Sequence, residues 1–460
     1  MRYGFSFLVA KRNEAYVLDT AFVGVGQRYL EITIRVRIND QRIENSSMNR
    51  ILSGLVTAFN LIGSYHEYVY CRFSESSDLR SLYWAFRRWS LRHCWYRLRL
   101  PFRRAKWAKR NWSVTRCLVK SMAAHSTTGS AIVFGEFKGK HGLGRGAAYD
   151  LKMIRGLHED VFMVDITDAL RGVEQRVNIS NTVFENAYFL CQPDTYWIIP
   201  RLIAPEAIAD AWRIGRWAWE TPLFPNAWQF AETLVHEVWA ASEFCAVTFE
   251  SALTVPVRVV PYPVTAPVQN DVDMRARLGI AEDAFVGLSI MDIYSCPARK
   301  NPWGHVLAWR AAFGSDLNCI LVMKIRFSKR SAIVLQELRD LIGHSKNIIF
   351  YTDELDDVEI AALHGMADVY ISLHRSEGFG LNILEALLLG KQVVATHYSA
   401  NVEYGSNFSN YWGVPFRLIP YHDWLSHYSG RFKYADPDVM LAGKIVRDIK
   451  NSSRADNGGV

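Results

Sequence analysis

Two glutamates, Glu377 and Glu385, stand eight residues apart around a glycine-rich turn. An apolar run ends at Leu373, and the pattern predicts a helix that begins near Leu381. The glycines of the Gly378–Gly380 turn let a ligand approach the backbone closely, and the new helix offers free N–H groups to an anion. A carboxylate one turn into that helix is suited to accept hydrogen bonds from hydroxyls such as a ribose diol. The pattern indicates a site for a phosphate-bearing ligand at the carboxyl end of a strand in an α/β sheet.

The residues around these glutamates resemble a known sequence family. The stretch SLHRSEGFGL over residues 372–381, followed by LLLG over 387–390, is similar to the Glu-x7-Glu motif of the retaining glycosyltransferases of family 4 (group 1). The match looks close to a bacterial branch that carries the same SLHRSEGFGL segment. The resemblance covers residues 131–450 and implies a GT-B fold and a nucleotide diphosphate sugar as donor.

The resemblance also implies roles for individual residues of the motif. It implies that Glu377 contacts the donor sugar and helps to orient the reaction centre. It implies that Glu385 holds the ribose of the nucleotide. It implies that the donor diphosphate binds the turn and the helix start between the two glutamates. These residues are Gly378, Phe379, Gly380, Leu381 and Asn382.

Two adjacent cations, Arg299 and Lys300, follow the first strand expected in the second half of the chain. They are similar to the basic pair of the family, which neutralises the leaving diphosphate. Two cations that face a phosphate stabilise the charge that develops as the glycosidic bond breaks. Lys324 ends the apolar run 320–323, where the family often has a lysine. A plain surface charge explains Lys324 equally well, and both interpretations stay open.

A glycine-rich loop over residues 135–145 follows a short apolar run and precedes a helix expected at 147–157. It resembles the first loop of the family, which faces the donor phosphates and the acceptor. Dinucleotide binding is the competing interpretation, but the glycines lack the GxGxxG spacing. The candidate site residues of this loop are His141, Gly142, Gly144 and Arg145.

Glu220 belongs to the segment GRWAWETP over residues 215–222, which resembles a strand of the same bacterial branch. Many members of the family have a histidine here that reaches the sugar, whereas this chain has Trp219 and Glu220. We predict that Glu220 is a polar group that faces the cleft. Capping of a helix is the alternative use of its carboxylate.

Two acidic clusters and the cysteines do not indicate a metal. The DxD sequence at 271–273 precedes a helix expected at 274–278, so N-capping explains it better. The acidic run 353–357 lacks the glycine turn and alternating ligands of a calcium loop. Seven scattered cysteines without a CxxC pair indicate reduced thiols in a cytoplasmic protein. We therefore predict no metal and no cofactor.

Two series of strands must position these residues. Short apolar runs alternate with helical segments from residue 131 onward, which predicts parallel sheets covered on both faces. The expected strands are 131–134, 161–165, 188–191, 213–219 and 257–261, then 284–290, 319–323, 347–351, 369–373 and 392–396. We predict an α/β protein of GT-B type with two Rossmann-like domains and a central cleft. Its parts are an accessory region 1–130, an acceptor domain 131–265, a donor domain 271–430, and a loop with a crossing helix 431–460.

The net charge of +7 is concentrated in one segment. Residues 80–120 contain 13 of the 53 Lys and Arg, and no Asp or Glu occurs from 80 to 135, which leaves 40 basic against 46 acidic residues elsewhere. Tryptophans interleave with these arginines, as in a helix that lies on an anionic membrane. A surface helix whose tryptophans pack on the protein is an alternative, and nucleic-acid binding is a weaker one, because no recognition motif is present.

The function that these patterns favour is hexosyl transfer from a nucleotide diphosphate sugar to a hydroxyl of a glycan or lipid-linked acceptor, with retention of configuration as the resemblance implies. No protein nucleophile is evident, so we expect the leaving phosphate to assist deprotonation of the attacking hydroxyl. A non-catalytic glycosyltransferase-like scaffold subunit is the alternative. We expect a cytoplasmic protein at the inner face of the membrane, without a signal peptide or a transmembrane helix.

Overall fold

The computed structural model describes four strands between residues 4 and 42, and residues 109–118, 129–173, 175–179, 182–328, 331–421, 428 and 432–457. By internal contacts the chain divides into two units, Met1–Asp78 and Leu79–Val460. In the first unit an antiparallel sheet pairs its strands in chain order: β1 (Gly4–Lys11), β2 (Glu14–Phe22), β3 (Ile32–Ile38) and β4 (Gln41–Arg42). Residues 43–108, which include most of the basic segment, lie outside the described residues.

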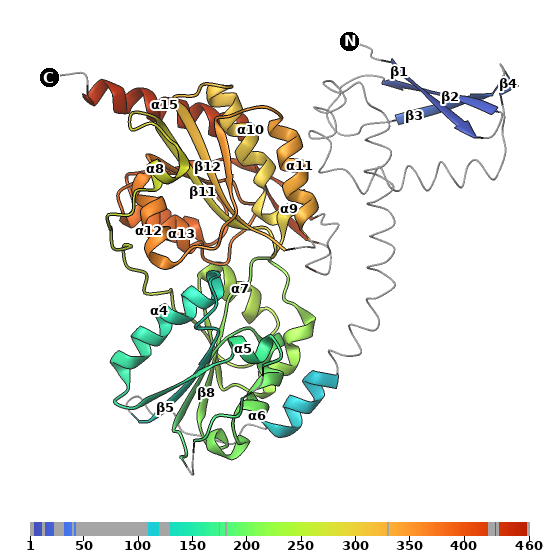
Figure 1. Cartoon of the computed structure of the whole chain (residues 1–460). Helices are drawn as coiled ribbons and strands as arrows, with labels where there is room; N and C mark the ends of the chain where they lie inside the picture. Colours follow the sequence, from blue (N-terminus) through green and yellow to red (C-terminus); the bar gives the residue numbers. More distant parts are fainter. Residues whose placement is uncertain are drawn as a thin grey trace. The chain divides into compact units, whose positions relative to one another are not determined.

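The second unit contains two parallel sheets, and the first has the strand order β10-β9-β8-β7-β5-β6 (Figure 1). All side chains of β5 and β7 are buried, which explains their apolar sequences. The strands are β5 (Ala131–Gly135), β6 (Val161–Asp165), β7 (Asn186–Leu190), β8 (Trp212–Trp217), β9 (Glu237–Ala240) and β10 (Val257–Val259). The helices are α4 (Gly142–Leu157), α5 (Thr167–Leu170), α6 (Ile199–Leu202) and α7 (Glu243–Glu250), with 3-10 turns at Pro193–Ile198, Pro205–Ile208 and Asn226–Thr233.

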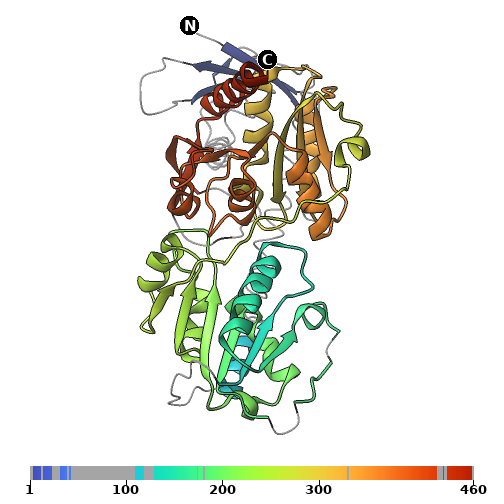
Figure 2. The same cartoon turned by 90° about the vertical axis from the view of Figure 1, so that its left-hand side faces the viewer.

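The second sheet has the order β13-β12-β11-β14-β15-β16, and helices lie on both of its faces (Figures 1 and 2). Its strands are β11 (Phe285–Asp292), β12 (Cys319–Arg326), β13 (Ile348–Tyr351), β14 (Val369–Ser372), β15 (Gln392–Thr396) and β16 (Tyr411–Val414). A hairpin of β17 (Phe416–Pro420) and β18 (Lys433–Pro437) follows. The helices are α8 (Met274–Leu278), α9 (Pro297–Lys300), α10 (Pro302–Phe313), α11 (Ala332–Ile342), α12 (Asp357–Met366), α13 (Leu381–Leu388), α14 (Asn401–Gly405) and α15 (Val439–Asn457).

The strand order creates a switch point in the second sheet. The chain runs from β11 to β12 and β13 on one side, and from β14 to β15 and β16 on the other, while β11 and β14 are direct neighbours. The segments that leave these two neighbours diverge, and ligands of such sheets bind outside the carboxyl ends at this point. Arg299 and Lys300 follow β11 and Glu377 follows β14, so the topology brings them together.

In the second unit all ten predicted strands are present, and the sequence missed β9, β16 and the β17–β18 hairpin. β9 is a four-residue strand that begins with a glutamate, so it lacks the usual apolar signal. The structure leaves Glu237 only 3% exposed, because Trp239 donates a hydrogen bond of 2.8 Å to its carboxylate and Arg258 lies 3.1 Å from it. Asp273 caps α8 by accepting a hydrogen bond from the Ala276 amide, as the N-capping interpretation of the DxD sequence predicted.

The last helix differs from its expected role as a crossing helix. α15 packs on α10, β15 and β16, which all belong to the second sheet and its helices. A Cβ at Gly443 would lie 2.6 Å from the Ala308 carbonyl oxygen, so this glycine permits the close approach. The connection to the first domain comes instead from the loop before β18, where the Tyr428 ring lies 5.2 Å from the Trp219 ring. Among the described helices, none is both long enough and apolar enough to span a membrane.

The expected boundary at residue 130 is also displaced. Residues 109–117 form a helix, and Val114 and Leu118 are buried in the core of the first sheet. The guanidinium of Arg213 fixes this segment by donating hydrogen bonds to the carbonyls of Leu118 (2.8 Å), Ile208 (3.0 and 2.8 Å) and Ala209 (3.1 Å). The first domain therefore begins within the basic segment.

We expect Arg213→Met to lower the free energy of unfolding by about 3 kcal/mol, because three carbonyl oxygens lose their donors in the interior. Urea unfolding followed by tryptophan fluorescence measures this change. The control Lys152→Met, at an exposed position of α4, should shift stability by less than about 0.5 kcal/mol. An Arg213→Met protein as stable as the control would contradict the role of Arg213 in holding residues 109–118.

Candidate active site at the switch point of the second sheet

A buried charge cluster joins the segments that follow β11 and β14. Arg299 is 3% exposed, and its Nη1 lies 3.0 Å from Oε2 of Glu377. The Nζ of Lys300 donates to the other carboxylate oxygen, Oε1. One carboxylate thus balances two cations that α9 presents side by side. The structure brings together the three residues that the sequence singled out for catalysis.

The two cations decide the charge state of Glu377. Burial alone would raise the pKa of its carboxyl group, but the charges of Lys300 and Arg299 outweigh burial and lower the pKa to about 2. Glu377 is therefore ionised at every physiological pH. Its ionised carboxylate engages both cations at once.

Buried polar contacts hold α9 against the end of β14. Asn301 adopts the left-handed region at φ 50°, and its side-chain amide donates a hydrogen bond of 2.9 Å to the Leu373 carbonyl. The ring of His305 accepts from the Leu373 amide at 3.0 Å, and burial lowers the pKa of His305 to about 4, which keeps it neutral for this role. Arg299 also donates 2.9 Å to the Ser376 carbonyl. These contacts fix both cations relative to the turn that carries Glu377.

The turn after Glu377 ends at a glycine that the backbone requires. Gly380 has φ +89° and precedes α13, which begins at Leu381. Tyr404 anchors the turn by donating its hydroxyl to the carbonyls of Phe379 (2.8 Å) and Gly380 (3.0 Å). The first amides of α13, at Leu381 and Asn382, lie at a helix N-terminus, where they can bind an anion.

Two other residues of the turn contact the first domain. A Cβ at Gly378 would lie 2.9 Å from the Trp219 carbonyl oxygen, and the Gly378 carbonyl accepts 2.8 Å from Ser242. The Phe379 ring packs at 5.1 Å on the Tyr262 ring. The lack of a side chain at Gly378 therefore permits the close contact with the first domain.

Glu385 is fully buried and faces the first domain. Its Oε1 accepts from Arg145 and, at 3.0 Å, from the Tyr149 hydroxyl. Arg145 also donates 3.0 Å to Oδ1 of Asn382. Burial raises the pKa of Glu385, and Arg145 opposes this rise. Arg145 was expected near the donor phosphates, and the structure places it on Glu385 and Asn382, which were predicted to bind the ribose and the diphosphate.

The glycine-rich loop of the first domain forms the start of α4. His141 caps this helix by accepting 3.2 Å from the Gly144 amide, and its other ring nitrogen lies 3.1 Å from Glu136. A Cβ at Gly144 would lie 2.2 Å from the Gly139 carbonyl oxygen, so the loop packs directly on the helix. Only open space adjoins the position of a Cβ at Gly142. His141 therefore shapes the loop as a helix cap, and Gly142 is the more accessible of the two predicted glycines.

Glu220, expected to face the cleft, lies beside the charge cluster. Its Oε1 is 3.4 Å from Nη2 of Arg299, and its Oε2 accepts 3.1 Å from the Tyr428 hydroxyl. Its backbone carbonyl accepts from the Ser376 hydroxyl. Arg299 thus contacts carboxylates from both domains.

Lys324 stands near the carboxyl end of β12, next to β11 in the sheet. It is 7% exposed, which contradicts the surface-charge interpretation. Burial lowers the pKa of its ammonium, and the nearby carboxylates of Asp292, Asp353 and Glu354 oppose this shift. The lysine lies at the same edge of the sheet as the cluster.

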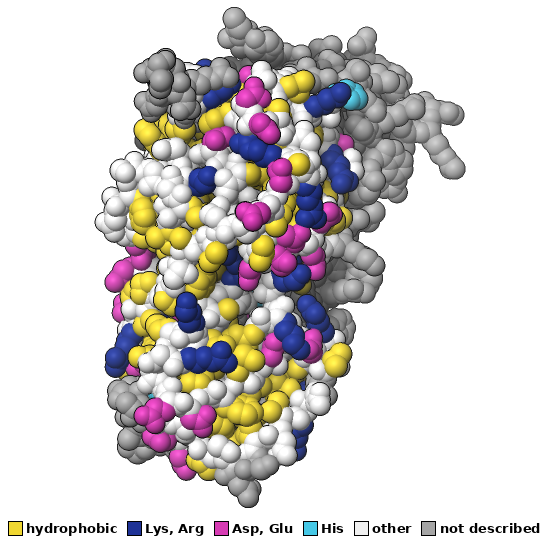
Figure 3. All heavy atoms as spheres, turned by 60° about the vertical axis from the view of Figure 1, so that its left-hand side comes forward, with side chains coloured by type: hydrophobic (Ala, Val, Ile, Leu, Met, Phe, Trp, Pro, Cys, Tyr) yellow, Lys and Arg dark blue, Asp and Glu magenta, His cyan; other side chains and the backbone are white. Residues whose placement is uncertain are grey.

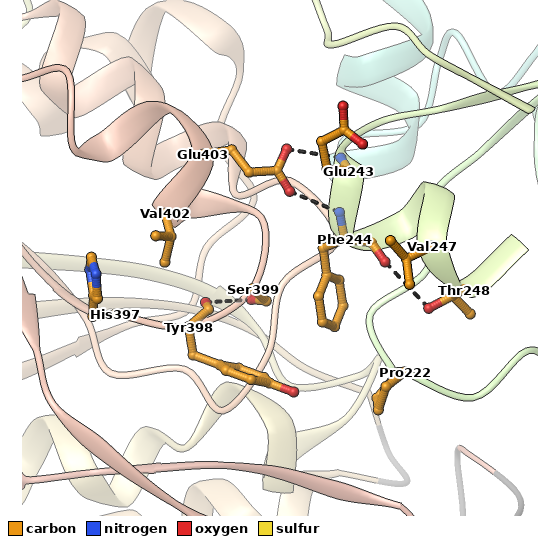
Figure 4. Close-up of a pocket in the computed structure, with 10 residues that line it drawn as sticks. All are labelled: Pro222, Glu243, Phe244, Val247, Thr248, His397, Tyr398, Ser399, Val402 and Glu403. Atoms are coloured by element: carbon orange, nitrogen blue, oxygen red, sulfur yellow. Dashed lines mark hydrogen bonds between the residues drawn. The ribbon is translucent and has the colours of Figure 1, made fainter. Parts of the chain in front are cut away.

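A hollow of about 400 Å³ lies between α7 and the loop after β15 (Figure 4). Phe244, Val247 and Tyr398 line it, and the carboxylate of Glu403 closes one end by accepting from the α7 amides of Glu243 (2.9 Å) and Phe244 (2.8 Å). Ser399, at φ 68°, also lines the hollow and accepts 2.8 Å from the Glu377 amide. The wall of this hollow is therefore hydrogen-bonded directly to the predicted catalytic residue.

The sequence missed several supporting residues of the site. Tyr149, Ser376, Ser399 and Tyr428 have no motif of their own, although Tyr149 follows Arg145 by one helical turn, which is a usable signal. His374 was within the recognised motif but had no assigned role; it lies 3.0 Å from Oδ1 of Asn401 and ties the two loops together.

The face of the molecule that Figure 3 draws is mixed in charge. Figure 3 shows Lys and Arg interspersed with Asp and Glu over the face it draws. Within the described residues, no three His, Cys, Asp or Glu side chains are grouped so that they could hold a metal ion.

A family model matches the part of the chain that contains the two glutamates. Residues 334–416 match the model of Glycosyl transferases group 1, which confirms the predicted resemblance over this range. No curated protein matches the sequence.

Solved structures of other proteins are similar to this chain. Alr3699/HepE of Anabaena, in complex with UDP and glucose, is 14% identical, with 71% of this chain and 91% of that chain covered at a TM-score of 0.51. A glycosyltransferase of Rickettsia africae is 15% identical over 71% and 92% of the chains, with a TM-score of 0.48. The likeness to HepE shows the fold, and the predicted GT-B architecture of two Rossmann-like sheets is confirmed.

The low pKa of Glu377 predicts how stability depends on pH. The pKa is about 2 in the folded state against 4.5 for an ordinary glutamate, so the carboxylate stabilises the fold above about pH 5 and loses this effect as the pH falls toward 2. Glu377→Gln should therefore be less stable than the wild type by about 3 kcal/mol at pH 7, and the difference should shrink as the pH falls.

Chemical denaturation at a series of pH values measures this difference. The control Glu282→Gln changes an exposed carboxylate and should show no such trend. A stability difference for Glu377→Gln that stays constant from pH 7 to pH 3 would contradict the strong coupling of Glu377 to Arg299 and Lys300.

Proposed function

We propose that this protein is a retaining glycosyltransferase that moves a hexose from a nucleotide diphosphate sugar, with UDP as the nucleotide, to a hydroxyl of a glycan or lipid-linked acceptor. The observation that carries the proposal is the pair Arg299 and Lys300 on one carboxylate at the switch point of the second sheet. The fold of HepE, whose structure holds UDP and glucose, supports UDP as the nucleotide.

The donor would bind along the carboxyl edge of the second sheet. Its diphosphate would meet Arg299, Lys300 and the first amides of α13, which together stabilise the charge that builds up on the leaving group. Glu377, held in place by both cations, would accept hydrogen bonds from hydroxyls of the sugar. Lys324 would add a further cation at the same edge.

The ribose would be held by Glu385. Arg145 and Tyr149 occupy its Oε1, so the ribose hydroxyls must displace at least one of them or use the second oxygen. Arg145 would then be free to turn toward the diphosphate. This exchange would join the two domains around the donor.

Retention requires the acceptor to attack on the same face that the phosphate leaves. The residues that surround Glu377 are cations and hydrogen-bond donors, and Glu377 is itself engaged by Arg299 and Lys300. An ionised phosphate oxygen at that position is the available base for the acceptor hydroxyl. Positioning and charge stabilisation therefore carry the rate enhancement.

A screen of nucleotide sugars with detection of the glycosylated product tests the proposal. We expect UDP to be released together with product, whose anomeric configuration matches the donor. Binding of nucleotide sugars without any release, over a broad set of acceptors, would favour the non-catalytic scaffold instead.

Lys300→Met should lower turnover by about 100- to 1000-fold, because one of the two cations that stabilise the leaving group is lost. The control Lys346→Met removes an exposed lysine outside the site and should keep wild-type turnover. Steady-state kinetics of both variants measures the effect, with circular dichroism to confirm folding. Turnover of Lys300→Met within a factor of two of the wild type would contradict the assigned role.

We also propose that the protein works at the surface of an anionic membrane. In the helix at residues 109–117, Trp112 is 61% exposed and the Arg116 guanidinium lies 4.8 Å from its ring. Arg110 and Arg201 both lie over the Trp197 ring, at 3.9 and 4.8 Å. Exposed tryptophan flanked by arginine suits the interface of anionic lipids. In the sequence, residues 109–117 directly follow the basic residues at 80–108.

Arg116→Glu should weaken binding to phosphatidylglycerol vesicles by about tenfold, because each basic residue near such a surface contributes about 1 kcal/mol. Co-sedimentation with phosphatidylglycerol and with phosphatidylcholine vesicles measures the effect, and Lys346→Glu is the matched charge reversal elsewhere. Absence of wild-type binding to the anionic vesicles would refute the membrane proposal. Steeply salt-dependent binding to RNA or DNA in its place would favour the nucleic-acid alternative.

A further inference from the structure

A buried cysteine and a buried lysine meet at the end of the second sheet that lies away from the candidate active site. Cys319 is the first residue of β12, whereas Lys324 stands five residues further along this strand, about 17 Å away. Lys450 reaches Cys319 from α15, which packs on α10 (Figure 1). None of the roles assigned above uses this pair.

The two reactive atoms are in direct contact. The Nζ of Lys450 lies 2.7 Å from the Sγ of Cys319. The carboxylate of Asp316 is beside both, at 3.3 Å from the sulfur and 3.5 Å from the nitrogen. The Phe313 ring lies 5.3 Å from the ammonium and covers it. Cys319 is fully buried, and Lys450 is 8% exposed.

The distance between nitrogen and sulfur is short for a non-covalent contact. Hydrogen-bonded nitrogen and oxygen atoms lie about 2.9 Å apart, and sulfur is larger than oxygen. Two atoms bonded to one common atom lie about 2.5 Å apart, as the backbone nitrogen and carbonyl carbon do across Cα. A bond to sulfur is longer than a bond between carbon and nitrogen, so a distance of 2.7 Å between Nζ and Sγ suits a single atom that bridges them.

The surroundings also favour a covalent link over a simple ion pair. A buried ammonium needs strong acceptors, and a thiol is a weak one. The nearest carboxylate, that of Asp316, is 3.5 Å away and also accepts 2.9 Å from the Asn318 amide. A neutral nitrogen bound through an oxygen atom to the sulfur would remove this poorly matched charge from the interior.

We propose that Cys319 and Lys450 form a redox-sensitive cross-link in which one oxygen atom joins Nζ to Sγ. The ammonium first gives one proton to Asp316 or to solvent. Dioxygen then accepts four electrons, two from the sulfur and two from the nitrogen, and one of its oxygen atoms becomes the bridge. The other leaves as water with the thiol hydrogen and one amine hydrogen, so that amine, thiol and dioxygen yield the bridge and one water.

The cross-link ties the last helix to the donor sheet. It closes a loop of 131 residues between Cys319 and Lys450, and such a closure reduces the freedom of the unfolded chain. Because the link lies at the far end of β12, it acts on the stability of the second domain and leaves the charge cluster untouched. Two equivalents of a dithiol return the free amine and thiol with release of water.

Accurate-mass analysis of digests of the full chain, after air exposure and with or without dithiothreitol, tests the proposal. We expect a peptide pair linked through Cys319 and Lys450. Its mass should equal the sum of the two peptides plus one oxygen atom and minus two hydrogen atoms. Dithiothreitol should abolish this species. The oxidised protein should unfold at a temperature about 5–10 °C higher than the reduced protein.

Two substitutions and an internal control complete the experiment. Lys450→Arg and Cys319→Ser should each lose the linked pair and the difference between oxidised and reduced protein. Cys191, which is equally buried but lies near the carboxylates of Glu136 and Asp194, should stay unlinked. A link without the oxygen atom, oxidation of Cys319 alone, or no change at all in the wild type would overturn the proposal.

Discussion

The candidate active site depends on the buried guanidinium of Arg299, which keeps its charge although it is almost fully shielded from water. Arg299 is 3% exposed, and arginine stays protonated in proteins, so the fold must supply anions around it. Glu377 from the turn after β14 is one, and Glu220 from the first domain is another. Lys300 shares Glu377, so two cations and two carboxylates balance each other within the cluster. We propose that this pair of cations, placed where the strand order switches, makes the site suited to a diphosphate.

The same constraint explains why the two domains meet at this point. The backbone of Trp219 and Glu220 contacts Gly378 and Ser376 directly, and Ser242 donates to the Gly378 carbonyl. At the other end of the motif, Arg145 occupies Glu385, the residue that would hold the ribose. First-domain side chains thus contact the residues that we propose as donor ligands. We therefore propose that donor binding is coupled to rearrangement between the domains.

Much of the fold could be predicted from the sequence, because buried parallel strands have long apolar runs. The strands that were missed lack that signal: β9 opens on Glu237, whose burial depends on partners distant in sequence, and β16 is short and half exposed. The residues that the sequence singled out, Glu377, Arg299 and Lys300, lie together because one sheet edge positions all three. The sequence could not reveal the contact of Arg145 with Glu385 or that of Gly378 with Trp219, because both depend on how the domains meet, which no local pattern encodes. The prediction that the last helix, α15, crosses to the first domain was wrong for the same reason.

Calorimetric titration of the wild-type protein with UDP and with uridine tests the central claim most directly, which is that the cations at the switch point exist to bind a diphosphate. The account predicts that UDP binds at least about 100-fold more tightly than uridine, because charge-assisted hydrogen bonds to two phosphates are added. Equal affinity for the two ligands, or no binding of either, would contradict it.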